Sequence, residues 1–192
     1  NLGTGTASEA ARWVQYCNGG SSTPQGKIRT LNGREAPYDV KVWGIGNETY
    51  GWWALGYTDP ATYGRRYLEF LQAMTCEDPG IEPVAVGADE NWPDWNRRLL
   101  DVIGHQAAYL ALHLYMPGDN KPQNMIMRAP ATARHHYMLS SAYLELDRRI
   151  RVMAGDLDAA LGKNHGTAIA LDEWNLWWWW PQVLRVWWKM RD

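Results

Sequence analysis

The stretches WGIGNE at Trp43–Glu48 and IALDEWN at Ile169–Asn175 decide the fold. Each reads as an apolar strand that ends in a glutamate and then breaks into a loop. Parallel α/β barrels keep their chemistry at the carboxyl ends of their strands, which face a common rim. Cleavage of a glycosidic bond commonly requires two carboxyl groups, and two such strands can provide them. One acts as acid and base and the other as nucleophile or base.

Around these stretches the sequence alternates between helix and strand patterns. Strict alternation predicts a parallel sheet with crossover helices, and we count four strands. Four strands suit either a doubly wound open sheet or half of an eight-stranded barrel. Residues 21–38 are expected to form a loop. The expected helices are 10–17, 58–78, 94–103, 133–161 and 181–192, and the expected strands are 40–46, 83–87, 109–115 and 167–172.

Composition narrows the class of protein. The chain has 192 residues, 46% of them hydrophobic, and a net charge of -2, which fits one soluble globular domain. A strongly basic nucleic-acid binder is excluded, and no apolar run is long enough to cross a membrane. The N-terminus lacks both a signal-peptide pattern and an initiator Met. Cys17 and Cys76 form neither a disulfide framework nor a metal site, and we expect both thiols to be buried on helices.

The aromatic content is unusual, with 13 Trp and 1 Phe. An indole ring offers a flat apolar face with a polar N–H edge, which suits stacking against a sugar ring. Compositional bias of the source is the alternative explanation for any single Trp.

Five residues carry the chemistry expected from the sequence. Glu48 and Glu173 are the candidate catalytic carboxylates, although a turn with a solvated Glu or a helix N-cap explains either motif alone. Asn47 can donate a hydrogen bond to a substrate hydroxyl. His113 and Tyr115 face the same side of one strand, where the phenol can hydrogen-bond a carboxylate nucleophile. We therefore also count His113 among the substrate-binding candidates.

Read together, these motifs resemble glycoside hydrolase family 51, the α-L-arabinofuranosidases. The resemblance extends over nearly the whole chain. Its segments are Asn1–Asn18, Val42–Tyr50, Leu112–Tyr115 and Ala170–Trp177. A large clan of barrel glycosidases shares the combination of an Asn-Glu motif with a later Glu. The motifs ARWVQYCN at 11–18 and DEWN at 172–175 narrow the resemblance to this family.

The resemblance implies roles for the individual residues. Glu48 is the acid/base and Asn47 the neighbour that binds the sugar 2-hydroxyl. Glu173 is the nucleophile, Tyr115 lies next to it, and Trp177 lines the sugar pocket.

The resemblance also implies an architecture. The expected fold is α/β, a partial (β/α)8 TIM barrel comprising about strands 4 to 7 with their helices. Residues 1–192 then form an incomplete catalytic domain that lacks the family's C-terminal β-sandwich. The sequence after Trp177 matches the family poorly.

The implied activity is that of a retaining exo-glycosidase that removes terminal α-L-arabinofuranosyl residues from oligosaccharides and polysaccharides, with no metal or organic cofactor. A related endo-xylanase or β-glycosidase activity and a non-catalytic sugar-binding fragment stay open. We expect no nucleic-acid or membrane partner, and leave open whether the parent enzyme is a homo-oligomer. The cytoplasm is the expected location, and secretion stays open because the native N-terminus is expected to be missing.

Overall fold

A computed structural model describes residues 3–116 and 142–176. The chain divides into two compact units, one comprising Asn1–Leu112 with Arg149–Ala170 and the other His113–Arg148 with Leu171–Asp192. Residues 133–141 of the expected long helix, Trp177 and the expected helix 181–192 lie outside the described residues. The elements are α1 (Ala7–Asn18), α2 (Pro24–Leu31), β1 (Val42–Ile45), α3 (Pro60–Glu77), β2 (Glu82–Ala85), α4 (Trp95–Ile103), β3 (Tyr109–Met116), α7 (Ala142–Leu161) and β4 (Ala168–Leu176).

The four strands lie in the order β1-β2-β3-β4. β1 pairs parallel with β2, and β2 pairs parallel with β3, which confirms the parallel sheet predicted from the alternation. Each strand lies beside the one that precedes it in sequence. A doubly wound sheet reverses its strand order at a switch point, whereas a barrel does not. The order therefore favours the barrel over the open sheet.

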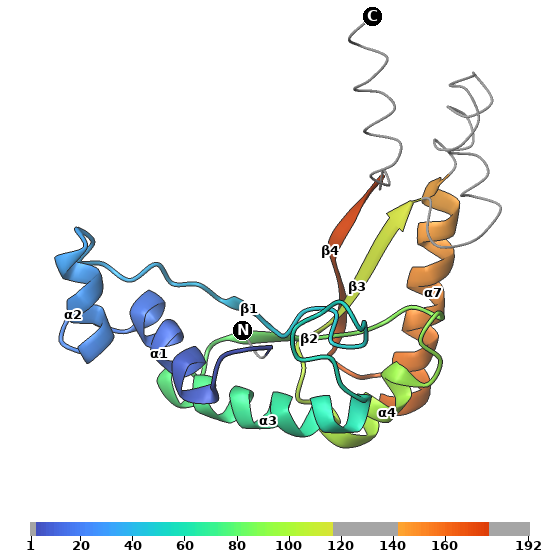
Figure 1. Ribbon diagram of the computed structural model, residues 1–192, viewed down its shortest axis with the longest axis horizontal. Coiled ribbons are helices and arrows are strands. Elements are labelled where there is room, and N and C mark those ends of the chain that lie inside the picture. Colours follow the sequence, from blue (N-terminus) through green and yellow to red (C-terminus); the bar gives the residue numbers. More distant parts are fainter. Residues whose placement is uncertain (1–2, 117–141, 177–192) are drawn as a thin grey trace, which may run out of the picture. The chain divides into compact units, whose positions relative to one another are not determined.

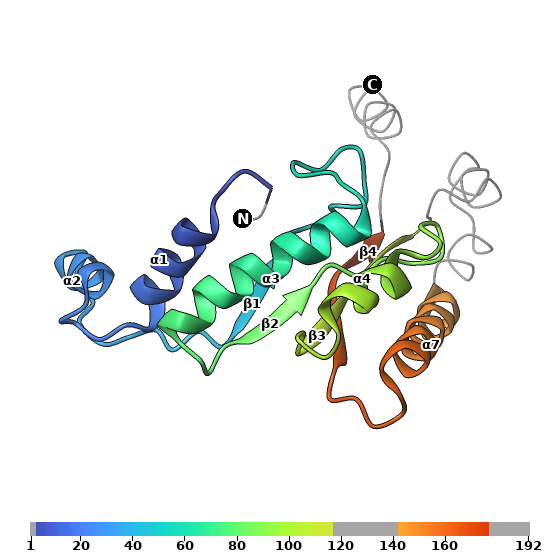
Figure 2. The same ribbon diagram turned by 90° about the horizontal axis from the view of Figure 1, so that it is seen from below.

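Helices cover one side of the first two strands. Within the first unit, α1, α3 and α4 lie in a row along the same side of β1 and β2 (Figures 1 and 2). The apolar residues of α3 recur at helical spacing, and these members of the stripe are all buried. They are Tyr63, Tyr67, Phe70, Leu71 and Met74. None of the described helices is both long and apolar enough to cross a membrane.

Several helix ends follow the sequence signals. Thr6 caps α1 in a reciprocal capping box with Glu9. Asp59 caps α3 by accepting hydrogen bonds from two backbone N–H groups in the first turn. α4 ends at Gly104, which has a positive φ of 54°.

Three expectations from the sequence are wrong. β4 does not break at Glu173 but continues to Leu176, beside a β3 that extends to Met116. β1 ends at Ile45, and Glu48 follows it in a turn. Cys76 is exposed near the end of α3, whereas Cys17 is half-buried, so the thiols are not both buried.

The expected loop 21–38 is also wrong, because it contains the helix α2. The side chain of Thr23 caps this helix by accepting a hydrogen bond from the backbone N–H of Gly26, and Pro24 occupies the first turn. Arg29, which is completely buried, then holds the helix in place.

Arg29 binds backbone carbonyls from segments on both sides of α2. Its Nη1 donates to the carbonyls of Tyr16 and Gly19, each at 2.7 Å. Its Nη2 donates to the carbonyl of Glu35 at 2.8 Å, and its Nε to that of Arg34 at 3.3 Å. A buried guanidinium with this many acceptors is well compensated for its lost hydration. The side chain therefore ties the end of α1 to the segment that follows α2.

Replacing Arg29 by Met should lower the free energy of unfolding by about 3 kcal/mol, because four backbone carbonyls lose a charged donor. Urea denaturation of the complete enzyme measures this loss. Lys27→Met is the matched control, since Lys27 is an exposed cation of the same helix and its replacement should change stability by no more than about 0.5 kcal/mol. Equal effects of the two substitutions would contradict the assigned role of Arg29.

Candidate active site

The loop that carries Glu48 begins in a constrained turn after β1. Gly46 has a φ of 99°, and a Cβ there would lie 3.2 Å from the Tyr63 ring and from Val86. Glu48 itself has a φ of 46°, in the left-handed region that few non-glycine residues adopt. Such conformations cluster at functional sites, where the surrounding structure enforces them.

Aromatic donors hold the carboxylate of Glu48. The indole N–H of Trp53 donates to Oε2 at 2.6 Å, and the hydroxyl of Tyr50 donates to Oε1 at 3.4 Å. Neither residue is among the candidates expected from the sequence. The signal that points to them is the run YGWW at residues 50–53, which begins two residues after Glu48 and contains three aromatic side chains with polar edges.

The aromatic side chains near Glu48 form a cluster that joins two loops. Trp92, from the loop after β2, lies 4.3 Å from Tyr50 and 5.9 Å from Trp53 between ring centroids. Trp95 packs edge-on against Tyr50 at 5.6 Å and donates its indole N–H to the Val86 carbonyl. The loop after β1 is therefore supported by the loop after β2 and the first residue of α4.

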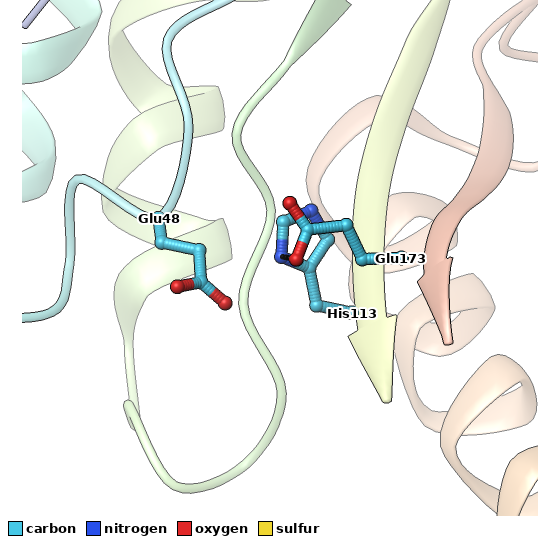
Figure 3. Close-up of side chains that lie close together, drawn as sticks. All are labelled: Glu48, His113 and Glu173. Carbon is cyan, nitrogen blue, oxygen red and sulfur yellow. Dashed lines mark ion pairs between the residues drawn. The ribbon is translucent and has the colours of Figure 1, made fainter. Parts of the chain in front are cut away.

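The second unit contains the other candidate carboxylate. Tyr115 donates its hydroxyl to Oε2 of Glu173 at 3.0 Å, and Nδ1 of His113 lies 3.4 Å from the same oxygen. Nε2 of His113 lies 3.3 Å from Oδ1 of Asp172. Figure 3 shows that His113 and Glu173 project from the neighbouring strands β3 and β4. The prediction that His113 and Tyr115 face the same side of their strand agrees with these contacts.

The structure thus brings the predicted residues together in two groups. Glu48 and the exposed Asn47 belong to the first unit, and His113, Tyr115 and Glu173 belong to the second. In each group a half-buried carboxylate accepts hydrogen bonds from aromatic side chains. A carboxylate held in this way has a fixed orientation, which both acid–base and nucleophilic catalysis require.

The chain is similar in sequence to known α-L-arabinofuranosidases. Residues 4–132 match the family model described as the alpha-L-arabinofuranosidase 1 domain. An intracellular exo-alpha-(1->5)-L-arabinofuranosidase of Bacillus subtilis is 31% identical over 92% of this chain and 34% of its own length. A probable alpha-L-arabinofuranosidase C of Aspergillus niger is 30% identical over 92% of this chain and 35% of its own.

Solved structures of α-L-arabinofuranosidases are similar to this chain as well. The alpha-L-arabinofuranosidase of Thermotoga maritima, solved as an arabinose complex, is 35% identical with a TM-score of 0.75 and covers 93% of this chain and 34% of its own. A family 51 alpha-L-arabinofuranosidase of Bifidobacterium longum is 26% identical with a TM-score of 0.77, over 93% of this chain and 35% of its own. The α/β fold of the chain thus matches part of a (β/α)8 barrel, and the chain spans about a third of the length of these relatives.

Proposed function

The chain belongs to the α-L-arabinofuranosidases of glycoside hydrolase family 51, and we propose that it supplies both catalytic carboxylates of a retaining exo-glycosidase. The proposed substrates are arabinose-containing oligosaccharides and polysaccharides, from which terminal non-reducing α-L-arabinofuranosyl residues are removed. One observation carries the proposal. The two glutamates that the family resemblance selects, Glu48 and Glu173, each accept a hydrogen bond from their own aromatic donors.

Glu173 is the proposed nucleophile. Its carboxylate attacks the anomeric carbon while the bond to the leaving oxygen breaks, and a covalent glycosyl-enzyme forms. The hydroxyl of Tyr115 donates to Oε2, so it orients this oxygen while the other oxygen keeps a lone pair for the attack. His113 lies between Glu173 and Asp172 and steadies both carboxylates.

Glu48 is the proposed acid and base. It gives its proton to the leaving oxygen in the first step, and in the second it takes a proton from the water that attacks the anomeric carbon and releases Glu173. Trp53 and Tyr50 fix the direction of the Glu48 carboxyl group. Asn47 and Trp177 are proposed to bind the sugar, with Asn47 on the 2-hydroxyl.

We further propose that the active enzyme contains more of the barrel than residues 1–192, together with a β-sandwich. Supporting this, the β1 edge strand leaves Val42 53% exposed, although strands of parallel barrels are normally buried on both faces. Trp174 in β4 is 66% exposed. Because the Bacillus relative is named intracellular, we propose a cytoplasmic location.

Substitution of the two glutamates in the complete enzyme should give distinct signatures. Glu173→Ala should abolish turnover, since no covalent intermediate can form. Glu48→Ala should slow natural oligosaccharides by about 100-fold or more and activated aryl glycosides far less, because only the former need protonation of the leaving oxygen. Steady-state kinetics on both substrate types measure these effects, and equal losses of Glu48→Ala on both substrate types would contradict its role as the acid.

Residues 1–192 alone should be close to inactive and poorly folded, because the edges of the sheet are open and apolar surface stays exposed. Thermal unfolding followed by circular dichroism, combined with an arabinofuranosidase assay, tests this expectation. A monomer with a sharp transition and normal turnover would overturn the proposal that further strands are needed.

A further inference from the structure

The loop after β2, residues 86–94, contains Trp92, and the indole of Trp92 contacts the side chains that hold Glu48. Its ring centroid lies 4.3 Å from that of Tyr50 and 5.9 Å from that of Trp53. Tyr50 and Trp53 donate hydrogen bonds to the two carboxyl oxygens of Glu48. A shift of the Trp92 ring would therefore move both donors of this carboxyl group.

Asp89 closes the turn that presents Trp92. The backbone N–H of Trp92 donates to the Asp89 carbonyl at 3.0 Å. The Asp89 carboxylate accepts hydrogen bonds from the backbone N–H of Asn91 at 2.9 Å and from its side-chain amide at 3.2 Å. The loop ends at Asp94 with a φ of 66°, a left-handed value that the surrounding contacts must enforce. The direction of the Trp92 side chain is thus set by the acceptors of one aspartate.

Helix α7 supplies the cation that holds this aspartate. Arg149 pairs with Oδ2 of Asp89, and the two side chains are 5% and 8% exposed. Burial raises the pKa of the Asp89 carboxyl, whereas the hydrogen bonds from Asn91 and the charge of Arg149 lower it. Removing one partner of a buried ion pair leaves the other charge without compensation. The ionised aspartate, and the turn that it closes, therefore depend on Arg149.

A second buried side chain holds the beginning of the same loop independently. Oδ1 of Asn96 accepts from the backbone N–H of Ala88, and its Nδ2 donates to the Ala88 carbonyl, both at 2.9 Å. The same amide nitrogen donates to Oδ2 of Asp156 in α7 at 2.9 Å. Loss of the Arg149 pair should therefore loosen the turn at Trp92 while the beginning of the loop stays in place.

We propose that Arg149 is a positioning residue for the protonation step and acts through Asp89 and Trp92. The inference rests on the proposed role of Glu48 as acid, and all of these residues belong to the first unit. The ion pair fixes the turn, the turn fixes the Trp92 ring, and the ring supports the two donors that orient the Glu48 carboxyl group. An acid transfers its proton efficiently only from within hydrogen-bond distance of the leaving oxygen. Loss of the pair should therefore impair protonation and spare the attack by the nucleophile.

The test uses the complete enzyme and two aryl glycosides, phenyl and dinitrophenyl α-L-arabinofuranoside. Their leaving groups share one aromatic ring, but only the strongly basic phenolate needs a proton as the bond breaks. We compare kcat/KM, which covers the steps up to the glycosyl-enzyme. Arg149→Met should lower kcat/KM for the phenyl glycoside about tenfold and change that for the dinitrophenyl glycoside by less than about twofold, because only the first depends on the proton from Glu48. Retained hydrolysis of the dinitrophenyl glycoside also shows that the variant is folded.

Arg151→Met is the matched control, because Arg151 is an exposed arginine of the same helix. It should leave the hydrolysis of both glycosides unchanged. The double variant Asp89→Asn/Arg149→Met contains no unpaired buried charge from this pair, so it should fold even if the single variant does not. It should show the same selective loss on the phenyl glycoside.

Equal losses on the two glycosides in these variants would indicate a purely structural role for Arg149 and overturn the inference. Unchanged hydrolysis of the phenyl glycoside would overturn it as well. Glu48→Ala provides the reference for a missing acid. If Glu48→Ala lowers kcat/KM equally for both glycosides, or if the unmodified enzyme cleaves neither, the proposed function itself fails.

Discussion

The hydroxyl of Tyr63 is the contact on which the first half of the candidate site depends. It donates to the carbonyl of Ile45 at 2.6 Å and accepts from the backbone N–H of Val86 at 2.8 Å. Tyr63 is completely buried, and this burial raises the pKa of its hydroxyl well above its usual range, so the group stays neutral. One side chain of α3 thus joins the ends of two neighbouring strands, and it pairs with a backbone donor of one and a backbone acceptor of the other.

The loops that follow these two strands also contact each other, through aromatic side chains. The loop after β1 carries Glu48 with Tyr50 and Trp53, and the loop after β2 carries Trp92, which packs on both aromatic side chains. The position of the Glu48 carboxyl group therefore depends on two loops anchored to one buried phenol. Glu173 is held differently, from within a strand and by side chains of the adjacent strand. The proposed acid and base therefore sits on a loop, and the proposed nucleophile sits within a strand.

Much of this arrangement was predictable from the sequence, where the signals are local. The capping box at Thr6 follows from the spacing of Thr6 and Glu9, and the stripe of α3 and the shared side of His113 and Tyr115 follow from helix and strand periodicity. The helix α2 was missed because the acceptors of Arg29 come from segments before and after it in the sequence. The contact between Trp53 and Glu48 depends on a turn with a left-handed glutamate, which no periodicity reveals. The end of β1 and the extent of β4 were misjudged because pairing, rather than the apolar run, determines where a strand stops.

The central claim is that Glu48 and Glu173 act together as acid/base and nucleophile of a retaining glycosidase. A crystal structure of the complete enzyme tests it most directly, through the separation of the two carboxyl groups. A retaining mechanism predicts a separation of about 5 to 5.5 Å, because the nucleophile must reach the anomeric carbon itself. A separation near 9 Å would leave room for a water molecule on the opposite face of the sugar, as in an inverting enzyme, and would contradict the account.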